Sequence, residues 1–463
     1  MKTGVGRMRL RFMNRTREIV KLKRALGASA PSLIVIYGRR RCGKSTLLQH
    51  VVKESDIYFL ADQQEPPLQI QSLAVEIGRT IPGFGQATYP SWDVLFSALQ
   101  HQAKKGATLV LDEFPYLVQK SPELPSILQK LIDSHQNKTH IILCGSSQRM
   151  MQGLVLDSTA PLYGRAVEII KVRPLEPGWI TEALSLSSVE AIEAYSVWGG
   201  VPRYWELAKT CKTQEDACKG LVLDRDGILH SEPMRLLLDD MRGANQPHSL
   251  LSLIANGANR LSEIAGRLGK PATNLTRPLA NLIELGYIRR DHPFGESPRS
   301  SKKTLYRLED PFLLFWYRIV LPNHSLLERD LVDAVYAESS TKFKAQNAEI
   351  WEEMARKSTA HLPIANMRWK PAQRWWGTGR DGKNMEIDIV AESLDKRYLL
   401  FGEAKWEEKT DIKATLRKLK KSAANFPKQT DQKKILAVWC KNDEIKTKEC
   451  CIIPPVDVLS GLK

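Results

Sequence analysis

The pattern that most constrains this chain is a short apolar segment, Leu33–Tyr37, followed by a glycine-bounded loop and by apolar residues at helical spacing over Ser45–Val52. The loop sequence, Gly38-Arg-Arg-Arg-Cys-Gly-Lys-Ser45, fits GxxxxGK[ST] in the strand–loop–helix context that this pattern requires. Such a loop wraps phosphates with backbone N–H groups, and the following helix adds the positive end of its dipole. We therefore expect a nucleotide site here rather than a plain glycine-rich turn.

Two side chains of the loop have distinct expected roles. Lys44 should reach the β- and γ-phosphates of ATP, and the Ser45 hydroxyl should ligate Mg²⁺. The expected nucleotide contacts are Gly38, Arg39, Arg40, Arg41, Cys42, Gly43, Lys44, Ser45, Thr46, Asp112 and Ser146.

A second apolar strand, Thr108–Glu113, ends in two acids. Asp112 is predicted to hold the magnesium shell and Glu113 to act as the base that polarises water, the alternative being a solvated acidic pair. Ser146 follows a third strand, Thr139–Cys144, and could sense the γ-phosphate or form a bare turn. Strands that alternate with helical segments predict a parallel α/β sheet.

The length of 463 residues predicts several domains. Strand character is lost after Pro174, and Glu182–Trp198 and Arg203–Leu223 have the pattern of helices. We expect a P-loop parallel-sheet core over residues 1–175, a helical lid over 176–243, a winged helix and linker over 244–335, and an α/β domain over 336–463. We find no internal repeat.

The predicted winged helix has two short helices over residues 250–268, a third at Asn274–Leu285, and strands at Tyr287–Arg290 and Thr304–Leu308. Pro278 fits a helix interior poorly, which would put the start of the third helix near Arg277. Side chains that could contact DNA are Thr273, Asn274, Thr276, Arg277, Asn281, Arg289, Arg290, Arg299, Lys302 and Lys303. A protein-docking or lid module is the alternative. We expect the aromatic residues Phe312, Phe315, Trp316 and Tyr317 to form core.

The C-terminal segment places Asp388 on one expected strand and Glu403 and Lys405 on the next. Period-two alternation puts Glu403 and Lys405 on one face, so two carboxylates could bind Mg²⁺ while the lysine steadies a water or phosphate. Glu352 on the preceding helix is a further metal ligand, which Glu349 or Glu353 could replace. This D…ExK arrangement resembles that of the PD-(D/E)XK nucleases, which implies a restriction-endonuclease-like fold. A basic helix containing Lys413, Arg417, Lys418, Lys420 and Lys421 would face phosphate or only solvent.

The net charge of +16 favours polyanions such as nucleic acid, although it also serves solubility. Part of it, in Arg39–Arg41, would serve the nucleotide instead. Seven cysteines without metal-ligand spacing indicate free thiols in a reducing compartment. The longest apolar run, Leu33–Tyr37, is too short for a membrane span, so we expect a cytoplasmic protein with no membrane partner.

Several sequence runs together resemble the archaeal-type ATPase family, a branch of the AAA+/STAND P-loop ATPases. They are IYGRRRCGKSTLL, LVLDEFPYL, LCGSS, Pro161–Arg165, and Gly199–Pro202 with Tyr204. The resemblance implies an ATPase core, a winged helix and a nuclease-like domain in this order, with Arg165 as a charge-sensing or finger arginine. It predicts that nucleotide state controls a DNA-directed effector half. A STAND-type switch with an inactive C-terminal scaffold and an ATP-liganded transcription regulator are the alternatives, and a homo-oligomer is left open.

Overall fold

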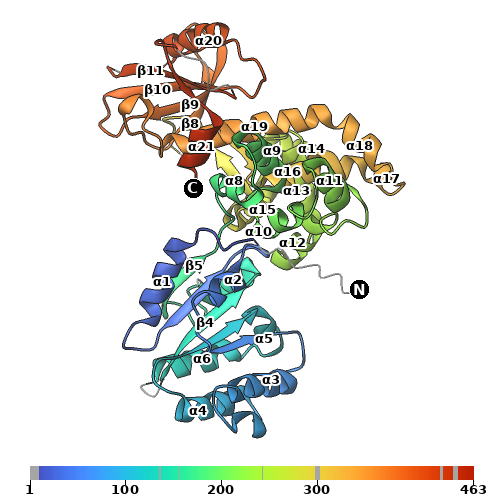
Figure 1. Ribbon diagram of the computed structural model, residues 1–463, viewed down its shortest axis with the longest axis vertical. Coiled ribbons are helices and arrows are strands. Elements are labelled where there is room, and N and C mark those ends of the chain that lie inside the picture. Colours follow the sequence, from blue (N-terminus) through green and yellow to red (C-terminus); the bar gives the residue numbers. More distant parts are fainter. Residues whose placement is uncertain are drawn as a thin grey trace. The chain divides into compact units, whose positions relative to one another are not determined.

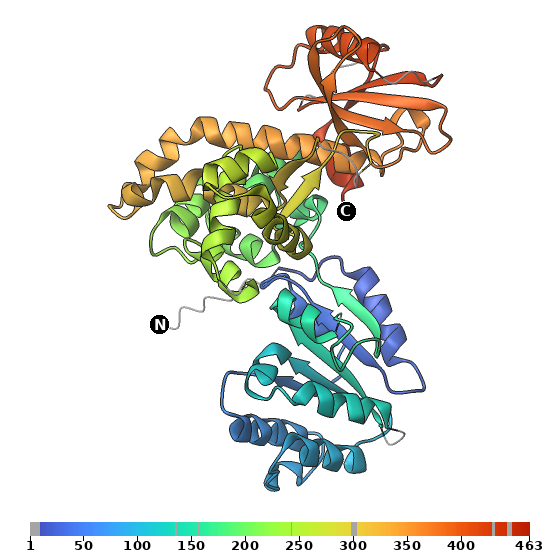
Figure 2. The same ribbon diagram turned by 180° about the vertical axis from the view of Figure 1, so that it is seen from behind.

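The computed structural model describes residues 10–134, 137–155, 157–241, 243–297, 303–427, 431–441 and 447–463. The chain forms two compact units. The N-terminal unit comprises residues 12–174 and 235–242, and the C-terminal unit comprises residues 1–11, 175–234 and 243–463. Residues 12–174 of the N-terminal unit are blue to teal in Figure 1, and Figure 2 shows both units from behind.

A five-stranded parallel sheet with strand order β2-β3-β4-β1-β5 forms the centre of the N-terminal unit. The strands are β1 (Leu33–Tyr37), β2 (Ile57–Leu60), β3 (Ala107–Asp112), β4 (Thr139–Gly145) and β5 (Ala166–Lys171). The helices around the sheet are α1 (Thr16–Leu26), α2 (Lys44–Gln49), α3 (Pro66–Gly78), α4 (Trp92–Gln102), α5 (Phe114–Lys120), α6 (Leu124–Asp133) and α7 (Gln148–Val155). The predicted parallel sheet is confirmed, although its edge strands β2 and β5 were not expected.

The central strands are continuous apolar runs in the sequence, because both faces of a parallel sheet are buried. All five residues of β1 and all seven of β4 are buried. On one face Leu33 and Val35 pack in a single core with residues of α3 to α6, such as Leu73, Leu95 and Leu128. All strands run the same way, so their C-terminal ends share one edge, where β1 continues into the glycine-bounded loop and β3 into the acidic pair.

The C-terminal unit begins with short helices where two long ones were expected. They are α8 (Ile180–Leu184), α9 (Ser188–Trp198), α10 (Pro202–Ala208), α11 (Gln214–Cys218) and η3 (Lys219–Leu223). Helix α12 (Glu232–Asp240) begins in this unit, and its residues from Arg235 onward belong to the N-terminal unit. Ser185 adopts a left-handed backbone conformation, and Ser187 forms a capping box with Glu190, so a new helix begins where continuity was expected. The Thr213 hydroxyl caps α11 by accepting from the Asp216 N–H.

The winged helix follows, with its expected order of three helices and an antiparallel hairpin. Its elements are α13 (Asn245–Ala255), α14 (Leu261–Leu268), α15 (Ala272–Leu285), β6 (Ile288–Asp291) and β7 (Leu305–Leu308). The third helix begins at Ala272, two residues before the expected Asn274, and the later start near Arg277 that Pro278 suggested is wrong, because α15 contains Pro278 in its interior. The buried stripe that includes Leu275, Leu279 and Leu282 offsets the cost of the proline, about 3 kcal/mol.

Helical segments connect the wing to the last domain. They are α16 (Pro311–Phe315), η4 (Trp316–Val320), η5 (Leu321–Asn323), α17 (His324–Leu327), α18 (Val332–Glu338) and the twenty-residue α19 (Ser340–Thr359). The aromatic residues Phe312, Phe315, Trp316 and Tyr317 are all buried, which confirms that they are core.

The C-terminal domain has a mixed five-stranded sheet with order β12-β11-β10-β9-β8. The elements are β8 (Gln373–Thr378), β9 (Asn384–Glu392), β10 (Tyr398–Ala404), α20 (Ile412–Asn425), β11 (Lys433–Trp439), β12 (Cys451–Ile453) and α21 (Pro455–Gly461). Strand β10 pairs antiparallel with β9 and parallel with β11. The core includes Trp375 on β8, Phe401 on β10 and Phe426 after α20. Across the described ranges, no helix is both long enough and apolar enough to cross a membrane.

Candidate functional site

The loop after β1 has the backbone geometry that a phosphate cradle needs. Gly43 has a φ of 88° directly before α2, a conformation that favours glycine. A Cβ on Gly38 would lie 2.3 Å from the carbonyl oxygen of Val172, so only glycine fits this close approach. The buried Lys44 donates from Nζ to the carbonyl oxygens of Gly38 at 2.9 Å and Arg39 at 3.3 Å. The loop therefore closes around the lysine that was expected to contact phosphate.

The predicted metal ligands lie together at the end of β3. Ser45 Oγ donates to Asp112 Oδ2 over 2.9 Å, and Asp112 is 1% exposed. The Tyr58 hydroxyl on β2 donates to the same carboxylate oxygen. Burial and the nearby Asp112 charge raise the pKa of Tyr58 above its ordinary value, so the phenol stays protonated and acts as a donor. A hydroxyl beside a buried carboxylate is a donor set suited to Mg²⁺.

The predicted base, Glu113, is held by the predicted sensor. Ser146 Oγ donates to Glu113 Oε1 over 2.6 Å, and the Ser146 backbone N–H donates to Oε2 over 3.1 Å. Glu113 itself has a φ of 53°, in the left-handed region, where a non-glycine residue is uncommon. Such strain concentrates at functional positions. The structure thus brings Lys44, Ser45, Asp112, Glu113 and Ser146 to one edge of the sheet.

The other loop residues differ in exposure. Cys42 and Arg39 are buried, whereas Arg40 and Thr46 are exposed and Arg41 is half-buried with a φ of 68°. Arg40 forms a 3.3 Å ion pair with Asp239 at the end of α12, within the N-terminal unit. The next residue, Asp240, accepts from the Gln148 N–H over 3.0 Å, just after Ser146. The end of α12 therefore contacts both the loop after β1 and the segment after β4.

Arg15 supports the loop and was missed from the sequence. Its buried guanidinium donates to the carbonyl oxygens of Cys42 at 3.0 Å and Arg173 at 2.7 Å, so it ties the loop to the end of β5. In the sequence Arg15 is one of many basic residues in the first fifty, and no local pattern distinguishes it. Tyr58 was missed because the sequence pattern around β2 is weak, so this strand was not expected.

Arg165 lies away from these residues. It directly precedes β5, whose first residue Ala166 pairs with Leu33 at the start of β1, whereas the loop follows the end of β1. A five-residue strand spans roughly 16 Å, so Arg165 is at the opposite edge of the sheet. Its guanidinium holds Asp133 through contacts of 2.8 and 3.1 Å. The structure does not bring Arg165 to the loop of its own chain.

A second cluster of ionisable residues lies on the C-terminal sheet. Asp388 on β9 and Glu403 on β10 are opposite one another, one position beyond the paired residues Ile389 and Gly402. Asp388 Oδ2 accepts from the backbone N–H of Ala404 over 3.1 Å. Glu403 is 4% exposed, and its Oε1 accepts from Lys405 at 2.9 Å. Asp388, Glu403 and Lys405 therefore lie side by side, as expected from the sequence.

Lys418 on α20 also reaches this cluster, with its ammonium 2.9 Å from the same oxygen of Glu403. Burial disfavours the charge on Lys405, but the hydrogen bond with Glu403 and the nearby acids raise its pKa, so it remains an ammonium. The whole basic helix was expected to face phosphate or only solvent, and Lys418 is a member of it that contacts the carboxylates. Lys420 instead pairs with Glu449 at 2.6 Å.

Of the three acids on α19, Glu352 is the one that acts on Asp388. Burial raises the pKa of Asp388 to about 6, and the charges of Glu352 and then Glu403 add to the effect. Glu349 instead pairs with Arg307 at 3.0 Å and Arg318 at 2.7 Å. Glu353 pairs with Arg289 at 2.7 Å and Arg356 at 3.2 Å. Three acids crowded together with one raised pKa form a cluster that a divalent cation would relieve.

The exposed face of α15 carries the residues that were expected to contact DNA: Thr273, Asn274, Thr276, Arg277 and Asn281 are exposed. Among the expected wing residues, Arg290 and Lys303 are exposed as well, and Arg299 and Lys302 lie outside the described residues. The expectation for Arg289 is wrong. Its side chain is 22% exposed and binds Asp291, Glu309 and Glu353, so it joins the wing to α19 rather than facing solvent.

A groove of about 1220 Å³ lies between the winged helix and the β8–β9 edge of the C-terminal sheet. Its lining includes five basic residues and the half-buried ring of Trp376, and Glu386 is the acid among its described lining residues. The basic residues that line it are Arg260, Arg290, Lys303, Arg307 and Arg374. The charges of Glu352 and Asp388 in the carboxylate cluster act on Arg374, which lines the groove.

Comparison with known proteins gives three domain matches along the chain. An ATPase domain predominantly from Archaea matches residues 12–207. The IclR helix-turn-helix domain matches residues 249–292, and a family of archaeal and bacterial proteins of unknown function matches residues 316–419. These matches agree with the parallel-sheet unit and the winged helix described above.

One relative and two solved structures align with most of this chain, and the alignments also cover most of their own length. An uncharacterised protein from Methanocaldococcus jannaschii is 30% identical over 451 residues, which are 96% of this chain and 98% of the relative. The Walker-type ATPase of Pyrococcus abyssi is 22% identical, with 66% of this chain and 96% of that chain covered and a TM-score of 0.48. The ORC2 protein of Aeropyrum pernix is 17% identical, with 70% and 96% covered and a TM-score of 0.43.

The alignment with the archaeal relative extends over nearly all of both chains, and the ATPase domain match includes the loop, the acidic pair and Ser146. The family resemblance expected from the sequence runs is thereby confirmed. The chain belongs to the archaeal ATPase family.

Proposed function

We propose that this protein is a Mg²⁺-dependent ATPase whose nucleotide state controls a DNA-directed C-terminal unit with a metal-dependent nuclease site. The observation that carries the proposal is the groove, because it is lined by exposed side chains of the winged helix and by Arg374, on which the charges of Glu352 and Asp388 act. One surface would then connect a DNA-reading element with a site suited to phosphodiester hydrolysis.

The residues at the edge of the parallel sheet fit Mg·ATP. The Ser45 hydroxyl and Asp112 carboxylate would hold the cation, and Lys44 would exchange its backbone partners for the β- and γ-phosphates. Mg²⁺, when bound, supplies charge neutralisation at the γ-phosphate. Glu113 would accept a proton from the attacking water once Ser146 turns from its carboxylate toward the γ-phosphate.

Helix α12 provides a route from the nucleotide to the C-terminal unit. Its first residue, Glu232, accepts from the Tyr204 hydroxyl over 3.2 Å within the C-terminal unit. Its last turn meets Arg40 of the phosphate loop and Gln148 within the N-terminal unit. A change in the loop on ATP binding would therefore bear on a helix that continues into the effector half.

The C-terminal cluster supports metal-dependent cleavage of a phosphodiester. Asp388, Glu403 and Glu352 would hold Mg²⁺ or Mn²⁺, which supplies a polarised phosphate and an activated water when bound. Lys405 would leave Glu403 to orient the water or steady the developing charge on phosphate. Lys418, exposed on α20, would neutralise a neighbouring phosphate.

We keep Arg165 as a finger residue only for a nucleotide bound by another copy of the chain. Its placement at the far edge of the sheet supports no role on its own nucleotide. A contribution of Arg165 to hydrolysis would therefore require a homo-oligomer, and it would appear as a turnover rate that rises with protein concentration.

The second candidate is a STAND-type switch whose C-terminal domain is an inactive scaffold. The observation that favours it is the pairing of Lys405 and Lys418 with one oxygen of Glu403, a self-satisfied arrangement that an inactive scaffold could also keep. In that case ATP would still be hydrolysed, and the output would be a protein contact.

Incubation of the full-length protein with plasmid DNA and Mg²⁺ or Mn²⁺, with and without ATP, tests the proposal. We expect nicking or linearisation by the wild type and loss of it in both Asp388→Ala and Lys405→Ala. Asp395→Ala is the matched control, since this exposed acid lies in the turn between β9 and β10 and pairs with Arg397 outside the groove and the cluster. Intact plasmid with the wild type, alongside normal ATP hydrolysis, would favour the switch.

A further inference from the structure

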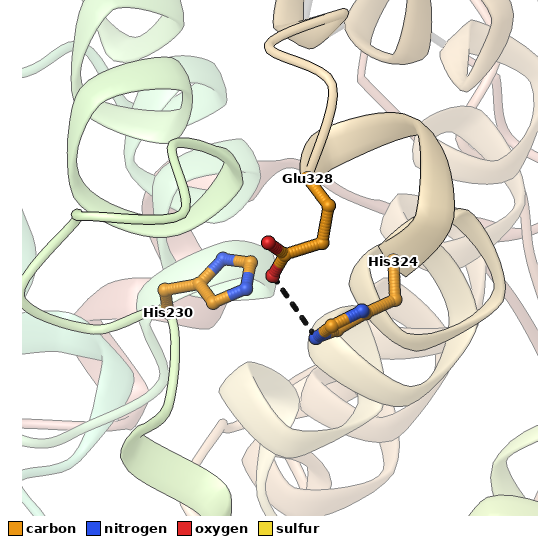
Figure 3. A group of neighbouring side chains, drawn as sticks. All are labelled: His230, His324 and Glu328. Carbon is orange, nitrogen blue, oxygen red and sulfur yellow. Dashed lines mark ion pairs between the residues drawn. The ribbon is translucent and has the colours of Figure 1, made fainter.

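Two histidines and a glutamate that have no role in the sites described above meet in the C-terminal unit. His230 lies between η3 and α12, His324 begins α17, and Glu328 follows one helical turn later. The ligand atoms of the three side chains all lie within 4.8 Å of one another. Figure 3 shows the Glu328 carboxylate between the two imidazole rings. The cluster thus joins two segments that are almost a hundred residues apart in sequence.

His230 is prepared to act as a ligand. The residue is 5% exposed, and its ring Nδ1 lies 2.9 Å from the carbonyl oxygen of Val222. A carbonyl can only accept, so Nδ1 carries the hydrogen and Nε2 carries the lone pair. Nε2 is buried and has no hydrogen-bond partner among the described residues. A buried polar atom without a partner is costly, which is the usual reason to look for a bound ion.

The backbone around His230 is fixed as well. Its carbonyl oxygen accepts from Trp316 Nε1 over 2.6 Å, and Trp316 is buried. The ring and main chain are therefore both held, so Nε2 points in one direction. Metal-binding histidines commonly have this arrangement, in which the second ring nitrogen donates to a carbonyl group.

The other two side chains can complete a coordination sphere with small movements. His324 Nε2 and Glu328 Oε1 are 3.6 Å apart, and both side chains are about half exposed. Bonds of about 2.0–2.1 Å in a tetrahedral site put ligand atoms roughly 3.3 Å apart. Spacing of four residues on helical backbone places His324 and Glu328 on one face. With His230 held in place, rotations of the His324 and Glu328 side chains are enough to bring all three ligands around one ion.

We propose that His230, His324 and Glu328 bind one divalent transition-metal ion, with Zn²⁺ as the best match. Imidazole nitrogen and carboxylate oxygen suit Zn²⁺ and its first-row neighbours, whereas Mg²⁺ and Ca²⁺ prefer sites made only of oxygen. Three protein ligands leave a fourth position for water. The site is separate from the nucleotide and carboxylate sites and does not depend on the function proposed for them.

The ion would reinforce a contact that weaker interactions already make. Arg225 donates to the carbonyl oxygen of Glu328 over 2.9 Å and lies 3.5 Å from Asp330. Lys219 forms a 2.6 Å ion pair with Asp333. These exposed pairs contribute little individually. A metal bound across the same boundary would hold the segment before α12, the helix that ends at the nucleotide loop, against α17.

Zinc titration of the full-length protein after EDTA treatment tests the proposal. We expect one Zn²⁺ per chain in the wild type, at least tenfold weaker binding in His324→Ala and in Glu328→Gln, and unchanged binding in His361→Ala, a matched exposed histidine. Zinc should also raise the melting temperature of the wild type and of His361→Ala only. Neither test variant removes a buried group, so both should fold.

Co²⁺ substitution identifies the ligand type. A site of two imidazoles and a carboxylate has no thiolate-to-cobalt charge-transfer band in the near ultraviolet, whereas ligation by the free cysteines does. The proposal is overturned if the wild type fails to bind Zn²⁺ at about 10 μM, if His324→Ala and Glu328→Gln bind as tightly as the wild type, or if the Co²⁺ spectrum has the thiolate band.

Discussion

Replacement of Asp388 by asparagine should stabilise the C-terminal unit at neutral pH while it abolishes the proposed metal site. Burial and the charges of Glu352 and Glu403 raise the pKa of Asp388 to about 6, from an ordinary value of 3.8. Each pKa unit corresponds to about 1.4 kcal/mol, so the ionised carboxylate costs the fold about 3 kcal/mol at pH 8. Asparagine removes the charge and keeps an oxygen that can accept from the Ala404 N–H.

The raised pKa of Asp388 determines how the stability gain from Asp388→Asn depends on pH. Between about pH 4 and 6 the folded protein keeps a proton on Asp388 that the unfolded chain has released. The wild type therefore loses stability as the pH rises through this window, and the variant does not. The gain from Asp388→Asn should be absent near pH 4 and complete above about pH 7.

Thermal unfolding of the C-terminal unit, followed by calorimetry at several pH values without divalent ions, measures the gain. We expect a melting temperature about 4–8 °C higher for Asp388→Asn than for the wild type at pH 8. Millimolar Mn²⁺ should raise only the wild type and so narrow the difference, because a ligand of the native state stabilises it by mass action.

Asp395→Asn is the matched control, because hydrogen bonds from Ser393 and Arg397 lower the pKa of Asp395 to about 2. Its stabilising contribution is present above about pH 4, so this substitution should lower the melting temperature at pH 8. An Asp388→Asn variant that melts at or below the wild-type temperature at pH 8, or whose gain is equal at pH 4 and 8, would refute the reasoning.

Three further substitutions test DNA contact by the wing, the structural ion pairs of Arg289, and the close backbone contact at Gly38. Arg290→Glu, on the exposed wing, should weaken DNA binding in a gel-shift titration and make it less steeply dependent on salt, by about one counterion. Arg289→Gln leaves Glu353 without its closest partner and should lower the melting temperature while the salt dependence of DNA binding stays unchanged. Gly38→Ala brings a Cβ against Val172 and should destabilise the N-terminal unit in the same calorimetric experiment, without an effect on Zn²⁺ binding.

The grouping of Lys44, Ser45, Asp112 and Glu113 at one edge of the sheet could be predicted because the sequence signals for it are local. The loop and the acidic pair each follow a strongly apolar strand, and parallel strands bring such ends to one edge of the sheet. The contribution of Tyr58 could not be predicted, because β2 is a short edge strand whose position beside β3 is set by tertiary packing. Arg15 was hidden for a similar reason, since its partners are backbone carbonyls more than twenty-five residues away.

The C-terminal half shows where sequence spacing reaches its limit. Alternation on β10 correctly put Glu403 beside Lys405, but α19 presents three acids within little more than one turn, and spacing could not choose among them. Arginines of the wing and linker bind Glu349 and Glu353, and these ion pairs distinguish the two acids from Glu352. The same long-range ion pairs removed Arg289 from the predicted DNA surface.

The most direct test of the central claim is Mg·ATP binding and hydrolysis by the wild type, Lys44→Ala and Glu113→Gln under identical conditions. We expect the wild type to bind and hydrolyse ATP, Lys44→Ala to lose the ATP-dependent rise in melting temperature, and Glu113→Gln to keep that rise but lose turnover. An ATP-dependent rise in Lys44→Ala equal to that of the wild type, or full turnover in Glu113→Gln, would contradict the account of the site between the phosphate loop and the acidic pair.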